Sequence, residues 1–192
     1  MKKVQLDLTF PHQYKVELGV NLPSVSAKIK RLYYPGSIEK GGQDGLVVSI
    51  IPFEGLPWVG IFAPGYPNAL TKVLSFPDER SVCVIASGQA YIVRADNPQI
   101  WKKAQLFPVW DARAILEKKL LVLVDFTVLT AYGPEGIIWT TNRLSWDGLK
   151  ITDVTSNCIR GIAWDSPRGK EVEFVVDIQT GRHEGGASPE MA

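Results

Sequence analysis

A short pattern of large apolar residues occurs twice in this chain of 192 residues, and it restricts the possible folds more than any other feature. Each copy consists of Ile-Trp, six to eight residues, Trp-Asp, three residues and Ile. The copies are Ile100-Trp101 with Trp110-Asp111 and Ile115, and Ile138-Trp139 with Trp146-Asp147 and Ile151. The Ile-Trp pairs are 38 residues apart and the Trp-Asp pairs 36. A period near 40 with about four strands in each unit is typical of a β-propeller blade, and such units must stack to bury their faces.

Short runs of alternating or β-branched apolar residues recur about every ten residues and predict strands. The first two runs, residues 3–10 and 14–20, alternate with a period of two and predict a hairpin. Residues 24–34 fit either a short helix capped by Ser24 or a strand, and the neighbouring strands favour a strand. Apart from 24–34, the predicted strands are 3–10, 14–20, 46–53, 58–63, 69–76, 81–87, 89–94, 104–110, 112–117, 119–125, 126–132, 137–145, 149–155, 158–164 and 171–177.

These patterns together predict an all-β protein of antiparallel sheets with blade-like repeats of about 38–40 residues, either a partial or a small β-propeller. A two-sheet β-sandwich is the alternative. Residues 60–181 form the repeat-bearing domain, residues 1–59 form an N-terminal β-hairpin region packed on it, and residues 182–192 form a disordered tail. Three units fit in the repeat-bearing domain, so either residues 1–59 or a second copy of the chain would complete the arc.

A stretch of about the last fifty residues resembles a group of uncharacterised bacterial proteins that end in propeller-like strands. The resemblance implies a bacterial protein with structural repeats, and it brings no activity with it. Trp-Asp pairs are also found in WD-repeat propellers, but neither histidine of this chain follows a glycine, as that motif requires. The residues that carry the bacterial resemblance are Trp146-Asp147-Gly148-Leu149, Gly161-Ile162-Ala163-Trp164-Asp165, Phe174-Val175-Val176-Asp177, Thr180-Gly181 and Gly185-Gly186.

Composition and motifs argue against several classes of partner. The net charge of +1 gives the molecule no strong field, and Lys28, Lys30 and Arg31 are too few to indicate nucleic-acid binding. The longest aliphatic run, 120–124, is far shorter than a membrane span, and no apolar signal segment follows the N-terminal lysines. We therefore expect a cytoplasmic protein without nucleic-acid or membrane partners.

Metal and cofactor sites are not expected either. The two histidines, His12 and His183, are far apart, there is no Cys-x-x-Cys pair, and no glycine-rich phosphate loop is present. Cys83 and Cys158 lie in apolar runs and are expected to be buried free thiols.

Carboxylates are the strongest candidates for chemistry. Asp125 interrupts an apolar run, so it either lines a pocket as an acid/base or bonds to backbone amides in a turn. Asp111, Asp147 and Asp165 each follow a tryptophan, which fits a ring of carboxylates or a set of turns.

The repeated tryptophans have two interpretations as well. They fit either a platform that stacks sugars or bases, or packing between repeats, and they are Trp101, Trp110, Trp139, Trp146 and Trp164. The sequence therefore favours a non-enzymatic binding or interaction module, with a protein or a small ligand as its partner. The alternative is a small-molecule or carbohydrate-binding enzyme that uses carboxylates from adjacent repeats, such as Asp125 with Asp111 or Asp147.

Overall fold

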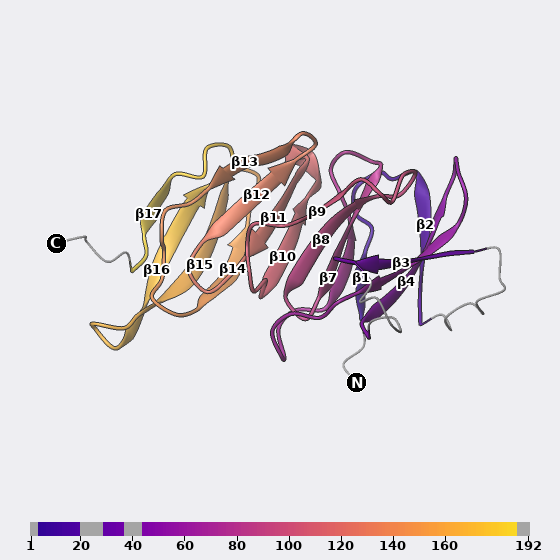
Figure 1. Cartoon of the computed structure of the whole chain (residues 1–192). Helices are drawn as coiled ribbons and strands as arrows, with labels where there is room; N and C mark the ends of the chain where they lie inside the picture. The colour runs from indigo at the N-terminus through magenta and orange to yellow at the C-terminus, as the bar shows by residue number, and fades with distance from the viewer. Residues whose placement is uncertain (1–3, 20–28, 37–43, 188–192) are drawn as a thin grey trace. The chain divides into compact units, whose positions relative to one another are not determined.

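The computed structural model describes residues 4–19, 29–36 and 44–187. In these ranges the regular elements are strands and one short 3-10 helix, η1 (Leu116–Lys118), so the all-β prediction is confirmed (Figure 1). No helix in the described part of the chain is long and apolar enough to cross a membrane. The chain divides into two compact units, Met1–Pro108 and Val109–Ala192.

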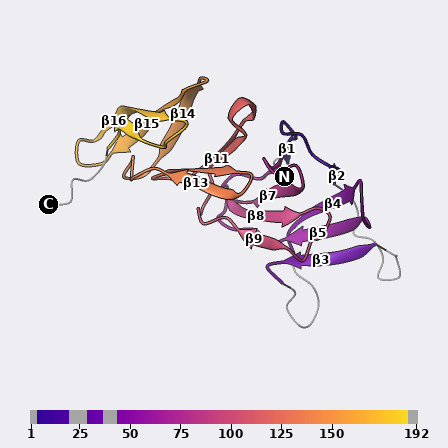
Figure 2. The same cartoon turned by 90° about the horizontal axis from the view of Figure 1, so that it is seen from above.

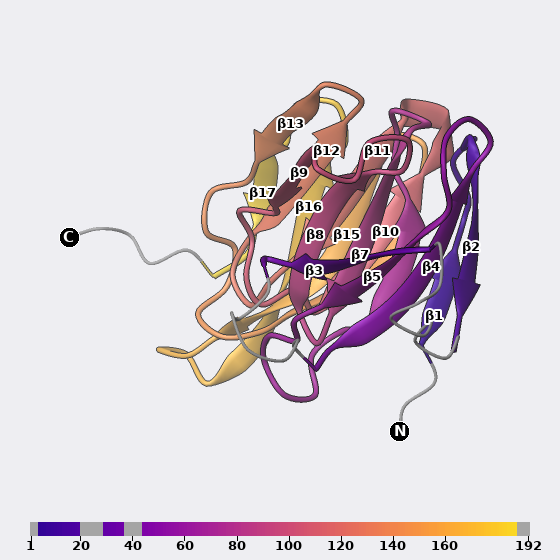
Figure 3. The same cartoon turned by 45° about the vertical axis from the view of Figure 1, so that its right-hand side comes forward.

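The first unit contains two sheets, and Figure 3 shows β2, β4, β5 and β3 as one of them. Strand β4 pairs antiparallel with β2 and β5, whereas β3 runs parallel to β5. The second sheet has the order β1-β6-β7-β8-β9. The bounds are β1 Gln5–Asp7, β2 Tyr14–Leu18, β3 Lys30–Tyr34, β4 Leu46–Pro52, β5 Trp58–Phe62, β6 Lys72–Ser75, β7 Ser81–Ala86, β8 Gln89–Arg94 and β9 Trp101–Lys103.

Aromatic residues fill the core between these two sheets. Tyr34 stacks on Phe62 with ring centroids 4.6 Å apart, and Tyr14 and Trp58 are also fully buried. The buried polar atoms of this core are paired with backbone: the Tyr14 hydroxyl donates to Ser81 O at 2.7 Å, and Trp58 Nε1 donates to Ala95 O at 2.8 Å. These bonds remove the cost of burying the polar ends of large aromatic side chains.

The second unit contains two antiparallel four-stranded sheets, each with its strands in chain order. Their facing sides share one apolar core that includes Val122, Leu129, Ile159 and Phe174. Figure 2 shows β14, β15 and β16 side by side in the second of these sheets. The bounds are β10 Asp111–Ile115, β11 Leu120–Val124, β12 Leu129–Gly133, β13 Gly136–Thr140, β14 Leu149–Val154, β15 Cys158–Asp165, β16 Lys170–Asp177 and β17 His183–Gly185.

The predicted blade-like repeat corresponds to one sheet. The antiparallel meanders begin with β6 at Lys72, β10 at Asp111 and β14 at Leu149, which gives spacings of 39 and 38 residues. The Ile-Trp pairs fall at the last strand of a meander, and the Trp-Asp pairs of the two repeat copies precede or open the next meander. The spacing of the sequence pattern therefore matches the spacing of these meanders.

Three predictions about the ends of the chain need correction. Residues 3–10 and 14–20 do not form a hairpin, because β1 pairs parallel with β6 and β2 pairs with β4. The domain boundary expected after residue 59 falls inside β5, and the division lies after Pro108 instead. The disordered tail expected at residues 182–192 is wrong for β17, which pairs with β16, and residues 188–192 lie outside the described ranges.

One strand assignment also changes, and another is confirmed in its described part. The strand predicted at 104–110 is wrong: β9 occupies Trp101–Lys103, and residues 104–110 connect it to β10. Pro108 in this connection has no N–H to donate to a ladder. Of the ambiguous segment 24–34, residues 24–28 lie outside the described ranges, and residues 30–34 form strand β3.

Candidate functional site

A pocket of about 380 Å³ lies in the second unit, where the first strand of each of its two sheets begins. This volume is within the range of about 300–1,000 Å³ that is usual for small-molecule sites. Two of the predicted carboxylates, Asp111 and Asp125, line the same pocket. Its lining residues are Trp110, Asp111, Arg113, Asp125, Phe126, Gly148, Leu149, Lys150 and Ile151.

Backbone hydrogen bonds hold the three segments of this pocket together. Trp110 N donates to Val124 O at 2.8 Å, which places the start of β10 beside the end of β11. Gly148 N donates to Phe126 O at 2.9 Å, which ties the start of β14 to the β11–β12 turn. As a result, the ring centroids of Trp110 and Phe126 lie 4.9 Å apart, and the two ring planes are inclined at 52°. Trp110 was one of the tryptophans that the sequence offered for stacking, whereas Phe126 was not a candidate.

Asp125 organises the turn between β11 and β12. Its Oδ1 atom accepts hydrogen bonds from Thr127 N at 2.6 Å, Val128 N at 2.7 Å and Thr127 Oγ1 at 3.1 Å. This arrangement agrees with the turn interpretation of Asp125, since aspartate often holds turns in this way. Its other oxygen, Oδ2, accepts no hydrogen bond from the described residues, so Asp125 both holds the turn and lines the pocket.

Asp111 is engaged on both carboxylate oxygens. Oδ1 accepts from Ala112 N at 2.8 Å, and Oδ2 accepts from Arg113 Nε at 2.9 Å and forms an ion pair with Arg113 Nη2 at 2.9 Å. This charge-assisted hydrogen bond orients the Asp111 and Arg113 side chains at the pocket. Lys150, on the edge strand β14, has no ion-pair partner among the described residues.

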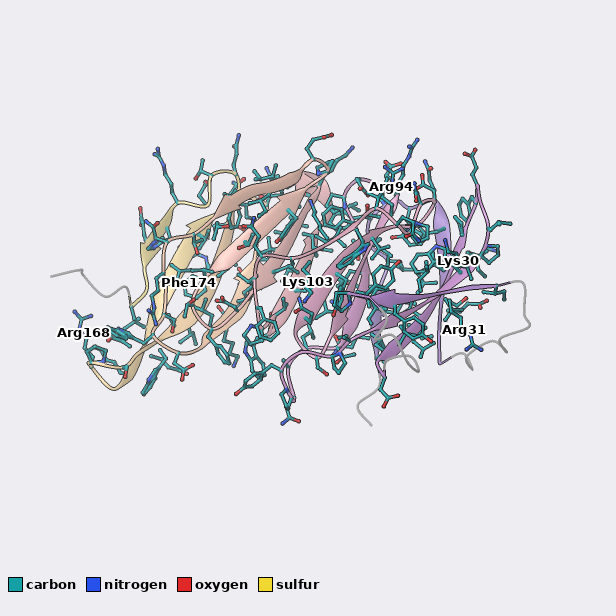
Figure 4. The ribbon with its side chains drawn as sticks, in the orientation of Figure 1. Lys30, Arg31, Arg94, Lys103, Arg168 and Phe174 are labelled. Carbon is teal, nitrogen blue, oxygen red and sulfur yellow. The ribbon has the colours of Figure 1, made fainter. Side chains whose placement is uncertain are left out.

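The other two acids that follow tryptophans lie elsewhere. Asp147 is exposed and adjoins the pocket residue Gly148 without lining the pocket. Asp165 is buried at the β15–β16 turn and forms an ion pair with Arg168 Nη1 at 3.2 Å; Figure 4 shows Arg168 at that turn. No group of three His, Cys, Asp or Glu side chains within residues 4–19, 29–36 and 44–187 is placed to hold a metal ion.

The candidate tryptophans are used for packing. The ring of Trp101 lies edge-on to that of Tyr34 in β3, with the ring centroids 5.4 Å apart. Trp139 Nε1 donates a hydrogen bond to Ile178 O, just after β16, at 2.8 Å. Trp146 lies under the Arg143 guanidinium, 5.4 Å from the ring centroid. The tryptophans of the repeated Ile-Trp pairs therefore pack between sheets, whereas Ile100 and Ile138 are exposed.

The remaining candidate groups also have structural surroundings. In the basic and aromatic cluster of β3, Tyr34 is buried, and burial raises the pKa of its hydroxyl (Figure 4 labels Lys30 and Arg31 of the same strand). Cys83 is a buried free thiol, as expected, and burial raises its pKa to about 12. Cys158, in contrast, is only half-buried.

Comparisons with known proteins give distant structural likenesses only. No family model matches the chain, and no curated protein matches it. Dihydro-heme d1 dehydrogenase NirN in complex with DHE is 15% identical with a TM-score of 0.48, over 78% of this chain and 34% of that one. The N-terminal domain of Nup159 is 13% identical with a TM-score of 0.43, over 96% and 53%.

A third solved structure, an S. cerevisiae complex of Dbp5 with Nup159, Gle1, IP6 and ADP, is 12% identical with a TM-score of 0.45. The match covers 99% of this chain and 54% of that one. This chain thus spans between about a third and about half of the chains it matches. At such values the likenesses carry no assignment of function.

Proposed function

We propose that this chain is a non-enzymatic binding module whose ligand site is the pocket between β10, the β11–β12 turn and β14. The observation that carries the proposal is the composition of this pocket. It combines a pair of aromatic rings with charged groups that the turn and the Asp111–Arg113 ion pair hold in place. Small-molecule sites commonly join an apolar surface to a few fixed polar groups in this way.

The contacts of the two acids support binding rather than catalysis. A catalytic carboxyl must exchange a proton with a reacting group, or attack it, from a position within hydrogen-bond reach. Both oxygens of Asp111 are engaged with Ala112 and Arg113, and Oδ1 of Asp125 holds three donors of its own turn. Proton transfer at these atoms would disrupt the local structure that forms the pocket.

The enzyme alternative draws on one observation, which is that Asp111 and Asp125 line the same pocket. The two acids come from one sheet, however, and not from adjacent repeats as the sequence suggested. Hydrolysis of chromogenic glycosides that disappears in Asp125→Asn, while that variant still binds the same glycosides, would establish this alternative.

Ligand-dependent thermal unfolding tests the proposed function. A panel of metals, nucleotides, sugars and acidic metabolites is applied to the wild type, to Lys150→Glu in the pocket, and to Lys170→Glu as the control. Lys170 is exposed on β16 and does not line the pocket. A ligand at 100 times its Kd adds about 2.7 kcal/mol to the free energy of unfolding. We expect a melting shift that Lys150→Glu loses and Lys170→Glu keeps. A panel without shifts, or shifts that Lys150→Glu retains, would refute the proposal.

A further inference from the structure

We infer that the pocket takes the ring of a neutral carbohydrate; this rests on the proposed function and names its ligand class. The lining combines two groups of features that such a ring satisfies at once. Its charged side chains offer hydrogen-bond donors and acceptors, and its aromatic side chains offer apolar surface. A sugar ring likewise has hydroxyls that donate and accept at its rim and C–H groups on its faces.

The charges of the lining favour a neutral ligand. Asp111 and Asp125 supply two negative charges, and Arg113 and Lys150 supply two positive charges, so the formal charge of the lining is zero. Arg113 is already paired with Asp111 through a hydrogen bond and an ion pair. A phosphate group is usually held by several free cationic or backbone donors, and a metal ion needs several free carboxylate or imidazole ligands. This lining offers neither set.

The hydrogen-bonding capacity that remains open is of mixed type. Asp125 Oδ2 accepts no hydrogen bond from the described residues, while Oδ1 is fixed by the turn. An ionised carboxylate oxygen only accepts, and the ammonium group of Lys150 only donates. A hydroxyl does both, so neighbouring hydroxyls on one ring can serve an acceptor and a donor together.

The apolar part of the lining fits the face of such a ring. Trp110 and Phe126 lie 4.9 Å apart and are inclined at 52°, and both side chains are half-buried. Leu149 and Ile151 of β14 also line the pocket, and their side chains pack against the apolar core of the unit. Aromatic faces carry negative charge density and attract C–H groups and cations. By contrast, Trp101 and Trp139, two of the other tryptophans that the sequence suggested for stacking, are packed between sheets.

Calorimetric titration with glucose, galactose, mannose, N-acetylglucosamine and their β-linked disaccharides tests this inference. The key variant is Asp125→Asn, whose side-chain oxygen can still hold the turn while an NH₂ group replaces Oδ2. Asp177→Asn is the matched control, because Asp177 Oδ1 accepts the same three types of bond in the β16–β17 turn, from Gln179 N, Thr180 N and Thr180 Oγ1. We expect at least one sugar to bind, with a Kd raised tenfold or more by Asp125→Asn and unchanged by Asp177→Asn.

The other outcomes separate this inference from the proposed function. If no sugar binds but another ligand class gives a melting shift that Lys150→Glu abolishes, the carbohydrate inference is wrong and the binding module stands. If nothing binds at the pocket, both are wrong. A sugar whose Kd changes equally in Asp125→Asn and Asp177→Asn does not occupy this pocket and overturns the inference. If Asp125→Asn fails to fold, Lys150→Gln on the exposed edge strand takes its place, with Lys170→Gln as its control.

Discussion

Replacing Asp125 separates its structural role from its role at the pocket. In Asp125→Ala, the backbone N–H groups of Thr127 and Val128, which donate at 2.6 and 2.7 Å, lose their acceptor. In Asp125→Asn, the amide oxygen can take the place of Oδ1, and only the charge and Oδ2 are lost. If the turn depends on the acceptor and not on the charge, the two substitutions must differ in stability.

The size of this difference follows from the bonds that are lost. A hydrogen bond to a charged acceptor contributes about 1.5–3 kcal/mol, and removal of an aspartate that caps backbone N–H groups in a similar manner at a helix start costs about 0.5–2 kcal/mol. Asp125 is half-buried, so water reaches part of the turn and replaces some of the lost bonding. We expect Asp125→Ala to lower the free energy of unfolding by about 1–2 kcal/mol, and Asp125→Asn by less than about 1 kcal/mol.

Urea denaturation followed by tryptophan fluorescence measures both values, with Asp177→Ala as the reference for a turn of the same type outside the pocket. The slope of the unfolding free energy against urea concentration should be the same in all variants, because the surface exposed on unfolding is unchanged. A loss below about 0.5 kcal/mol for Asp125→Ala would show that the turn does not depend on this carboxylate. Equal losses for the Ala and Asn variants would show that the charge, and not the acceptor, stabilises the turn.

Three further predictions concern other parts of the fold. Gly181→Ala should lower the unfolding free energy by about 2 kcal/mol or more in a thermal melt, because Gly181 has φ +70° and an added Cβ would lie 2.7–2.8 Å from ring atoms of Trp139. Burial alone would raise the pKa of Asp7, but hydrogen bonds, chiefly from Lys72, lower it overall. The stability contributed by this ion pair is therefore present above about pH 4, the usual pKa range of aspartate, and is lost as the pH falls through the lowered pKa. Urea titrations from pH 6 to pH 2 should show a flatter acid dependence for Asp7→Asn, and an unchanged profile would contradict this assignment. Leu56→Ser should change stability by less than about 0.5 kcal/mol, because Leu56 is 84% exposed at the β4–β5 turn, and a larger loss would mean that this side chain packs in solution.

The sequence predicted the local units of the fold well and the pairing of its strands poorly. Alternation and β-branched runs depend on which face of a strand is buried, and this property is local. The partner of a strand is not encoded in the same pattern, so β1 and β2 looked like a hairpin although each pairs elsewhere. The meanders from β6 onwards were easier to predict because neighbours in the chain are also neighbours in the sheet.

The pocket could be predicted only in part. The β10–β11 hairpin pairs Asp111 with Val124, and this register alone places Trp110 near Asp125 and Phe126. A sequence argument that followed the hairpin from its turn at residues 116–118 could have found that contact. The approach of Gly148 to Phe126, which brings β14 and Lys150 to the pocket, joins two sheets and has no local signal.

Asp125 and Asp177 show why an aspartate in an apolar run is weak support for chemistry by itself. Both side chains hold a turn through one oxygen that accepts two backbone N–H groups and a threonine hydroxyl. The Asp177 turn is exposed, whereas the Asp125 turn lines a pocket together with an aromatic pair and Lys150. The turn explains why an aspartate stands at each position, and the surroundings alone distinguish the two. A ligand effect confined to Asp125 would therefore reflect the second oxygen and its pocket, since the first oxygen has the same task at both sites.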